Sequence, residues 1–181
     1  MTKMSILKRA LICAVCIALC VVLPMAFHSI PDAGSILSPM HIPALLCGLV
    51  CGPWFGLLCG LAGPLLSSQL TGMPMMAYLP PMMVELAVYG LVAGLMMQFV
   101  RTKKSLVDVV ISMIAAMLVG RIVAGAAKAL IFAAGEFTMA MWISSYFVAM
   151  IPGIIMHLVA VPALYYALEK AHLIPRRYPK A

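Results

Sequence analysis

Three charged side chains, Glu85, Arg121 and Lys128, lie within long apolar stretches of this sequence. A charge buried among apolar helices in lipid costs several kcal/mol, so such a residue is a candidate for function. Arg121 and Lys128 are seven residues apart, which places them on one face of a helix. An anionic ligand would suit the two cations, and Glu85 would accept a hydrogen bond from a hydroxyl or amide group.

Further polar and aromatic residues are expected near the level of Glu85 and Lys128, since a helix rises about 1.5 Å per residue. They are His41, Gln69, Thr71, Trp142 and Tyr146. Together they would form a pocket with net positive charge at one face of a membrane. Purely structural roles are the alternative for the same residues. Glu85 could simply pair with Arg121, and Lys128 could extend to the interface. Trp142 and Tyr146 could be interfacial anchors.

The composition indicates that lipid, not water, surrounds most of these residues. Of 181 residues, 65% are hydrophobic and 9% are charged, whereas a soluble domain has about 25% charged residues. Asp, Glu, Lys and Arg are absent from residues 33–84 and 137–168. A membrane-spanning helix needs about 20 apolar residues, and only helices or closed barrels satisfy their backbone in lipid. We therefore predict an all-α integral membrane protein, with residues 1–181 in a single domain.

The apolar runs and their Pro- and Gly-rich breaks divide the chain into six transmembrane helices. Pro152 and Pro162 are expected to kink the last of them, because proline removes a helical hydrogen-bond donor. The expected ranges are about 6–27, 42–51, 54–70, 82–100, 106–134 and 139–168.

The cations predict the orientation of these helices. Apart from Arg121 and Lys128, ten of the twelve Lys and Arg residues fall on one side if the chain crosses six times. These are Lys3, Lys8, Arg9, Arg101, Lys103, Lys104, Lys170, Arg176, Arg177 and Lys180. The positive-inside rule makes that side the cytoplasm. We therefore expect a multi-pass protein of the cell membrane with both termini in the cytoplasm.

Small residues recur every four positions in two places. Ala10, Ala14 and Ala18 form such a series on the first helix, and a second series is Gly48, Gly52, Gly56 and Gly60. Stripes of this kind allow close packing of helices in lipid. The glycines are expected to pack inside the bundle, and the alanines to pack either there or against another subunit.

Motifs for catalysis or metal binding are missing from the sequence. The six cysteines lie in apolar segments, where cysteine behaves as a small hydrophobic residue. Cys13 and Cys16 have the spacing of a metal or redox pair but no second pair nearby. No nucleophile elbow, zinc-protease motif or phosphate loop occurs. We predict no enzyme activity, no metal site and no cofactor, and we expect His157 to be a packing residue.

Two features together are similar to a known family. The segment from Ser38 to Gly48, SPMHIPALLCG, is followed by Gly52-Pro-Trp-Phe-Gly56. This run resembles helices 2 and 3 of the pantothenate-type branch of the substrate-binding S components of energy-coupling-factor (ECF) vitamin transporters. The alanine stripe on the first helix and the count of six helices resemble the same family.

This resemblance implies a function and partners. An S component captures a micronutrient outside the cell and docks on a transmembrane coupling protein that two cytoplasmic ATPases drive. Ala10, Ala14 and Ala18 would then form the docking stripe, and the cationic pocket would favour a carboxylate-bearing ligand such as pantothenate. Vitamin B6, cobalamin and haem are alternatives, the last with His41 and Met40 as axial ligands. No nucleic acid is expected as a partner.

Two other classes of protein are rival readings. An intramembrane enzyme could use Glu85 with His41 or His157, but paired acidic or metal-ligand motifs are lacking. A channel or stand-alone secondary transporter should show duplicated halves with broken helices in corresponding places. The break at Gly52-Pro53 has no counterpart in the second half of the chain.

Overall fold

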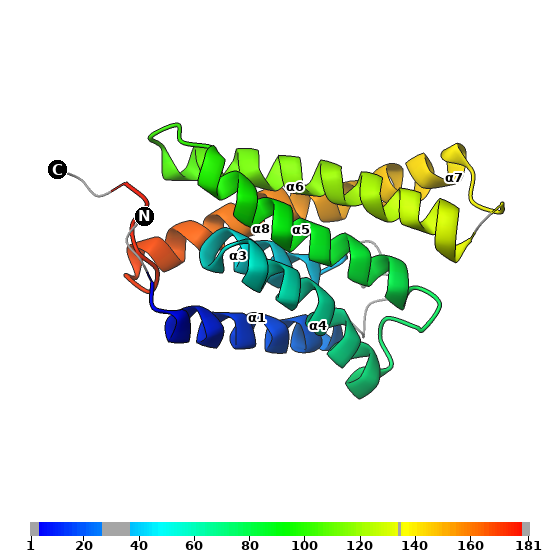
Figure 1. Ribbon diagram of the computed structural model, residues 1–181, viewed down its shortest axis with the longest axis horizontal. Coiled ribbons are helices and arrows are strands. Elements are labelled where there is room, and N and C mark those ends of the chain that lie inside the picture. Colours follow the sequence, from blue (N-terminus) through cyan, green and yellow to red (C-terminus); the bar gives the residue numbers. More distant parts are fainter. Residues whose placement is uncertain (1–3, 27–36, 134, 179–181) are drawn as a thin grey trace.

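The computed structural model describes residues 4–26, 37–133 and 135–178 (Figure 1). All regular structure in these residues is helical, which confirms the predicted all-α class. The elements are α1 (Ile6–Ala26), α3 (His41–Cys51), α4 (Pro53–Thr71), α5 (Leu79–Phe99), α6 (Ser105–Ala127), the π-helix η1 (Lys128–Phe132), α7 (Met139–Ile143), the π-helix η2 (Ser144–Val148) and α8 (Ile151–Lys170). The segment 28–41 between the first two expected helices lies largely outside the described residues.

Four helices in the described part of the chain are long and apolar enough to cross a membrane. They are α1, α5, α6 with its continuation η1, and α8. By contrast, α3 has only 11 residues, about half of a membrane span. In place of one helix over 139–168, the chain forms α7, η2 and then α8, which begins one residue before Pro152.

The described ends of the chain lie together. Figure 1 shows the start of α1, the end of α8 and the turn between α5 and α6 at one end of the molecule. The turns after α4 and before α7 lie at the other end. The ten cations that the sequence groups on one side belong to these three segments and to the chain ends. The structure places eight of them at this common end, and Lys3 and Lys180 are outside the described residues.

Glycines bring the backbones of α4 and α5 into contact. A Cβ atom built on Gly56 would lie 2.3 Å from the carbonyl oxygen of Gly90, and one on Gly60 would lie 2.3 Å from backbone atoms of Leu86. Gly52 serves differently: its φ of 97° is a left-handed conformation that favours glycine, and it separates α3 from α4. The predicted packing inside the bundle is therefore confirmed for Gly48, Gly56 and Gly60, and Gly52 has no such contact.

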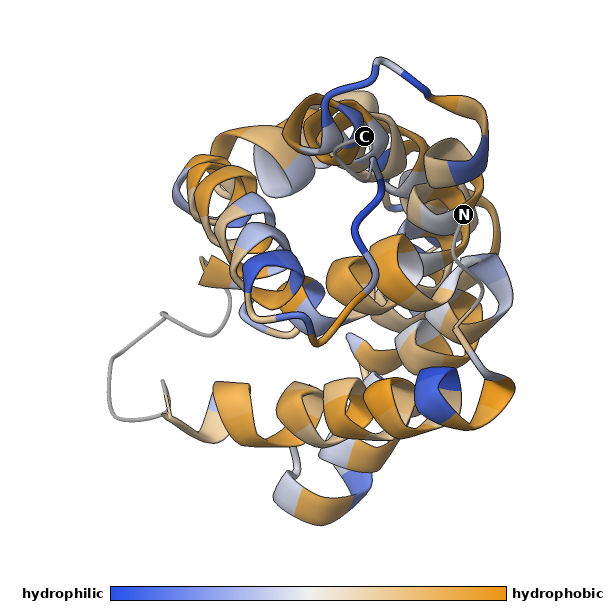
Figure 2. Ribbon diagram, turned by 90° about the vertical axis from the view of Figure 1, so that its left-hand side faces the viewer, coloured by the Kyte–Doolittle hydropathy of each residue, from blue (hydrophilic) through white to orange (hydrophobic). Residues whose placement is uncertain are grey.

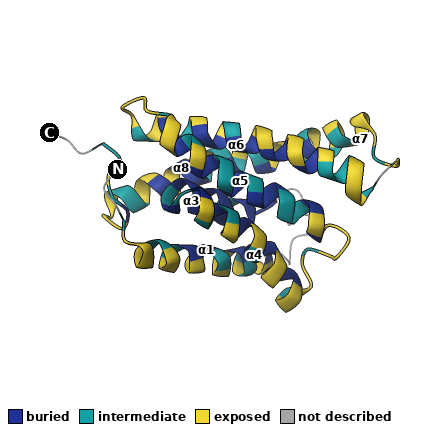
Figure 3. Ribbon diagram, in the orientation of Figure 1, coloured by how far each residue is buried: buried dark blue, intermediate teal, exposed yellow. Residues whose placement is uncertain are grey.

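Helix α1 has two chemically different faces. Its buried face carries Cys13, Cys16 and Cys20, which pack against thiols of α3 and α4. Cys13 and Cys47 both donate to the carbonyl oxygen of Phe55, at 3.6 and 3.4 Å. The opposite face is exposed, as the outer edge of α1 in Figure 3 shows. The three alanines of the stripe, Ala10, Ala14 and Ala18, all lie on this exposed face.

Candidate functional site

Four buried polar residues from three helices meet in the middle of the bundle and form the ionic cluster: His41, Glu85, Tyr89 and Arg121. The Tyr89 hydroxyl donates to Glu85 Oε1 at 2.7 Å, and Arg121 Nε donates to the Tyr89 oxygen at 2.9 Å. Glu85 Oε1 also lies 3.9 Å from Arg121 Nε and 3.7 Å from His41 Nε2. Glu85 is 8% exposed and Arg121 is 3% exposed, so the pairing offsets a large desolvation cost.

The helices make room for this cluster at one glycine. Glu85 and Tyr89 are four residues apart, so they share a face of α5 and their side chains can bond. Tyr89 reaches α6 because Gly120 lies directly beneath its ring. A Cβ atom on Gly120 would lie 2.2 Å from the Tyr89 ring. Gly120 therefore fixes the place where Arg121 meets Tyr89.

Two histidines fasten the start of α3 to α8 beside the ionic cluster. His41 Nδ1 and His157 Nε2 lie 3.0 and 3.1 Å from the carbonyl oxygen of Ser38. A carbonyl only accepts, so each of these nitrogens donates. The two rings are stacked with centroids 5.4 Å apart. With one nitrogen bonded to Ser38 and the other facing Glu85, His41 is poorly placed to be an axial haem ligand.

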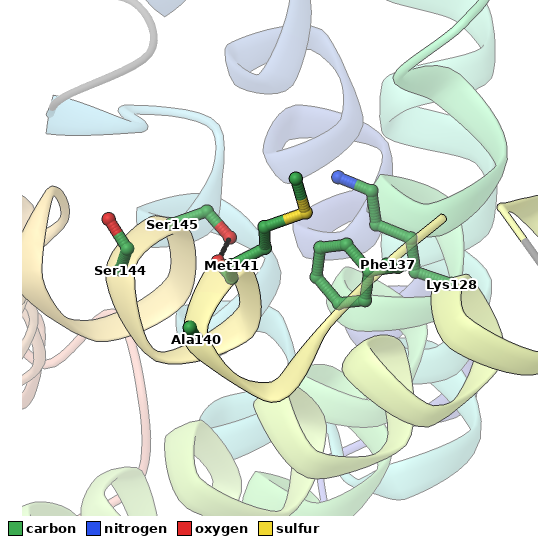
Figure 4. Close-up of a pocket in the computed structure, with 6 residues that line it drawn as sticks. All are labelled: Lys128, Phe137, Ala140, Met141, Ser144 and Ser145. Atoms are coloured by element: carbon green, nitrogen blue, oxygen red, sulfur yellow. Dashed lines mark hydrogen bonds between the residues drawn. The ribbon is translucent and has the colours of Figure 1, made fainter. Parts of the chain in front are cut away.

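An open cleft of about 560 Å³ lies beyond the ionic cluster, at the end of the molecule away from the start of α1. This Lys128 cleft is lined by Lys128, Phe137, Ala140, Met141, Ser144 and Ser145. Lys128 Nζ lies 4.7 Å from the centre of the Phe137 ring, a cation–π contact. Figure 4 shows the amine of Lys128 and the thioether of Met141 on the same side of that ring. The cleft thus combines a cation, an apolar wall and hydroxyl groups.

Both π-helices border the Lys128 cleft. Lys128 is the first residue of η1, and Ser144 and Ser145 are the first two of η2. A π-turn inserts an extra residue into a helix and is frequent at functional sites. Here the first residues of both π-helices line the same cleft and supply its polar side chains.

Aromatic residues connect the Lys128 cleft with the ionic cluster. Trp142 Nε1 donates to the carbonyl oxygen of Arg121 at 3.1 Å, and its indole packs against Gly125. The Arg121 guanidinium lies over the Phe147 ring, 5.5 Å from its centre. The segment of α7 and η2 therefore contributes to both places at once.

Comparison with known families assigns the chain. The family model "ECF transporter, substrate-specific component" matches residues 8–165. The chain belongs to this family. No curated protein and no solved structure matches it. ECF substrate-specific (S) components bind small molecules and associate with coupling and ATPase subunits. The chain is therefore a substrate-binding subunit of a membrane transporter. This family is one of transport subunits and not of enzymes.

In this S component the predicted pocket residues fall into separate groups. Among them, the contacts in the described residues bring together His41, Glu85, Arg121 and Trp142. Tyr146 is buried and its ring contacts Phe137, so it lies by the Lys128 cleft. Gln69 is exposed near the end of α4 and has no described contact with the others. Thr71 donates to the carbonyl oxygen of Ser67 within its own helix, at 2.7 Å.

Several residues of the site carried little signal in the sequence. Tyr89 could have been found, because it follows Glu85 by four residues on the same helix. Phe137 and the serine pair at 144–145 gave no such hint, since their place depends on η2 and on the turn before α7. Among the described residues, no group of three or more His, Cys, Asp or Glu side chains is arranged to hold a metal ion.

Proposed function

We propose that this S component captures a carboxylate-bearing micronutrient, such as pantothenate, in the Lys128 cleft. The observation that carries the proposal is the state of Lys128. It is half-buried, it faces a cleft, and no described ion pair includes it. A carboxylate would supply the missing partner, through a charge-assisted hydrogen bond.

The other linings of the cleft fit the rest of such a ligand. Phe137 and Met141 offer an apolar wall for methyl groups, and the Ser144 hydroxyl suits a hydroxyl or amide group. The Ser145 hydroxyl donates to the carbonyl oxygen of Met141 at 2.6 Å, so it can accept a hydrogen bond from a ligand. The volume of about 560 Å³ lies within the range of small-molecule sites. The resemblance of the Ser38–Gly56 segment to the pantothenate-type branch supports the same ligand class.

The ionic cluster has a different part in this proposal. Its charges are satisfied within the protein, so we assign it to holding α3, α5 and α6 in register beneath the cleft. Through Trp142 and Phe147 it also supports the α7–η2 wall. Glu85 and Arg121 would then position the ligand site without contacting the ligand.

The orientation in the membrane is part of the proposal. We place the end that carries the grouped cations in the cytoplasm. The six proposed crossings are α1, α3, α4, α5, α6 with η1, and the segment from α7 to α8. The Lys128 cleft then opens to the outside of the plasma membrane, where a capture subunit meets its ligand. The exposed stripe of Ala10, Ala14 and Ala18 supports α1 as the helix that docks on the coupling protein.

Ligand binding tests the first part. Mass spectrometry of the purified protein should detect a carboxylate-bearing molecule, and added pantothenate should bind. Lys128→Met should weaken binding about 10- to 100-fold, because a hydrogen bond to a charged group is worth about 1.5–3 kcal/mol. Lys103→Met, on the turn between α5 and α6, is the matched control and should bind as the native protein does.

A neutral analogue sharpens this test. Panthenol has a primary alcohol in place of the carboxylate, so it should bind the native protein weakly and the Lys128→Met variant no worse. If Lys128→Met leaves pantothenate binding intact, the cleft is not the carboxylate site. If the co-purified ligand carries no carboxylate, as is the case for a vitamin B6 form or a cobalamin, the ligand class is wrong; a haem would keep the carboxylate but exclude pantothenate.

Co-purification with the coupling and ATPase subunits tests the docking helix. Ala14→Leu places a bulky side chain on the exposed stripe and should abolish assembly while ligand binding persists. Val15→Leu, also on the exposed face of α1, is the control. Assembly that survives Ala14→Leu would show that the alanine stripe is not the dock.

A further inference from the structure

A second groove, separate from the Lys128 cleft, lies at the end of the molecule that carries the grouped cations. Its volume is about 360 Å³, and it lies between the first turns of α1 and the segment that follows α8. Three basic side chains line it: Lys8 from α1, and His172 and Arg176 from the segment after α8. In Figure 2, which faces this end, hydrophilic residues gather near the start of α1 and in the segment after α8.

The segment after α8 is held in place, so the groove has a fixed wall. Arg177 donates to Asp108 Oδ2 and to the carbonyl oxygens of Met97 and Val100, which end α5. The Tyr178 hydroxyl donates to the same Asp108 oxygen at 2.6 Å. Because Arg177 turns inward to these partners, its neighbour Arg176 is presented to the groove.

The floor and the opposite wall are equally well defined. Ile174 is buried in the main hydrophobic core and anchors the segment. His172 has a φ of 59°, at a helix end where glycine is usual, and this backbone turn brings its ring into the groove. On the other side the Ser5 hydroxyl accepts from the backbone nitrogen of Lys8 at 3.3 Å and caps the first turn of α1.

Among the described residues, no acidic side chain forms an ion pair with the charges of the groove. The described ion pairs involve His41, Arg121 and Arg177, and none of them includes Lys8 or Arg176. Both side chains are exposed, and Lys8 stands close to the outward-facing Ile6 and Leu7 at the start of the apolar helix α1. A group that suits this place carries negative charge at the head and apolar chains alongside α1.

We propose that, while the S component is undocked, this basic groove binds the phosphate headgroup of an anionic phospholipid, with the acyl chains against the exposed face of α1. The occupant follows from charge complementarity together with position, since juxtamembrane Lys and Arg residues attract anionic lipids. The site is separate from the Lys128 cleft and does not depend on which micronutrient the cleft takes.

Native mass spectrometry of the purified protein with dioleoylphosphatidylglycerol tests the proposal. The double variant Lys8→Gln, Arg176→Gln should bind this lipid about 10- to 30-fold more weakly than the native protein. The matched control is Lys103→Gln, Lys104→Gln, which removes the same charge from the same end and should leave the affinity unchanged. Lys8→Arg, Arg176→Lys keeps both charges and should retain the lipid, which separates loss of charge from loss of fold.

Three outcomes would overturn the proposal. Equal losses in the groove variant and the control would show that diffuse surface charge binds the lipid. Unchanged lipid binding with lost assembly on the coupling subunits would identify the groove as a protein contact. Displacement of the lipid by inorganic phosphate at millimolar concentration would show a site for free phosphate in place of a headgroup. Micronutrient binding should be the same in all these variants.

Discussion

The ionic cluster and the Lys128 cleft are two charged places with opposite properties, one at Arg121 of α6 and the other at Lys128 of η1. In the cluster, Arg121 is buried and its partners Tyr89 and Glu85 come from the neighbouring helix. In the cleft, Lys128 is half-exposed and its described partner is the face of an aromatic ring. A cation whose needs are met inside the protein contributes to its architecture, whereas one left facing a cleft is available for a ligand.

Removing the carboxylate of the ionic cluster should have the largest effect on stability. Glu85→Leu leaves Arg121 buried without its counter-charge and should lower the free energy of unfolding by about 3–5 kcal/mol. Denaturant titration of the protein in detergent measures this. Glu136→Leu, which removes an exposed carboxylate near the cleft, should change the same quantity by less than about 0.5 kcal/mol.

A rescue experiment accompanies that prediction. Replacing both charges, Glu85→Leu with Arg121→Met, should recover much of the stability lost by Glu85→Leu alone, because no unpaired charge then stays buried. Equal stability of the native protein and Glu85→Leu would mean that the cluster does not organise the bundle.

A smaller effect is expected from crowding the cluster. Gly120→Ala places a methyl group against the Tyr89 ring and should lower the free energy of unfolding by about 1–3 kcal/mol. Tyr89→Ala removes the ring, so adding Gly120→Ala to that variant should have little further cost. The difference between the two measurements gives the coupling of Gly120 with Tyr89. Additive losses would show that the two residues do not touch.

The smallest change in stability is expected at the cleft. Lys128→Met loses a cation–π contact with Phe137 and should lower the free energy of unfolding by about 0.5–1 kcal/mol at most. The same variant should show the large loss of ligand affinity given above. A loss of stability as large as that of Glu85→Leu would place Lys128 with the architectural charges and remove the contrast between the two places.

The sequence shows which charged residues lie in apolar segments, but it does not show which of them are paired inside the protein and which face a cleft. Apolar composition is enough to predict a helical membrane protein, and the seven-residue spacing is enough to put Arg121 and Lys128 on one face. Depth along a helix follows from the rise per residue, but rotation about its axis does not when every side of the helix is apolar. Gln69 illustrates this limit, because it was expected at the level of the pocket and lies on an exposed face of α4.

The parts of the site that the sequence did not predict depend on local irregularities of the helices. The cleft depends on two π-turns and on the short α7, none of which has a periodicity that a sequence reveals. Pro152 predicts a disturbance of the last helix, yet proline alone does not say where the chain leaves and resumes its helical path. The role of Gly120 could not be predicted from the sequence alone, because it depends on the Tyr89 ring of another helix packing against it.

The contact of Gly56 with Gly90 has a mechanical consequence. Two helices that are separated by side chains can shift past one another when those side chains change rotamer. At Gly56 and Gly90 the backbones themselves are in contact, with no side chains between them to change rotamer. Helices α4 and α5 should therefore travel as one rigid unit during a transport cycle.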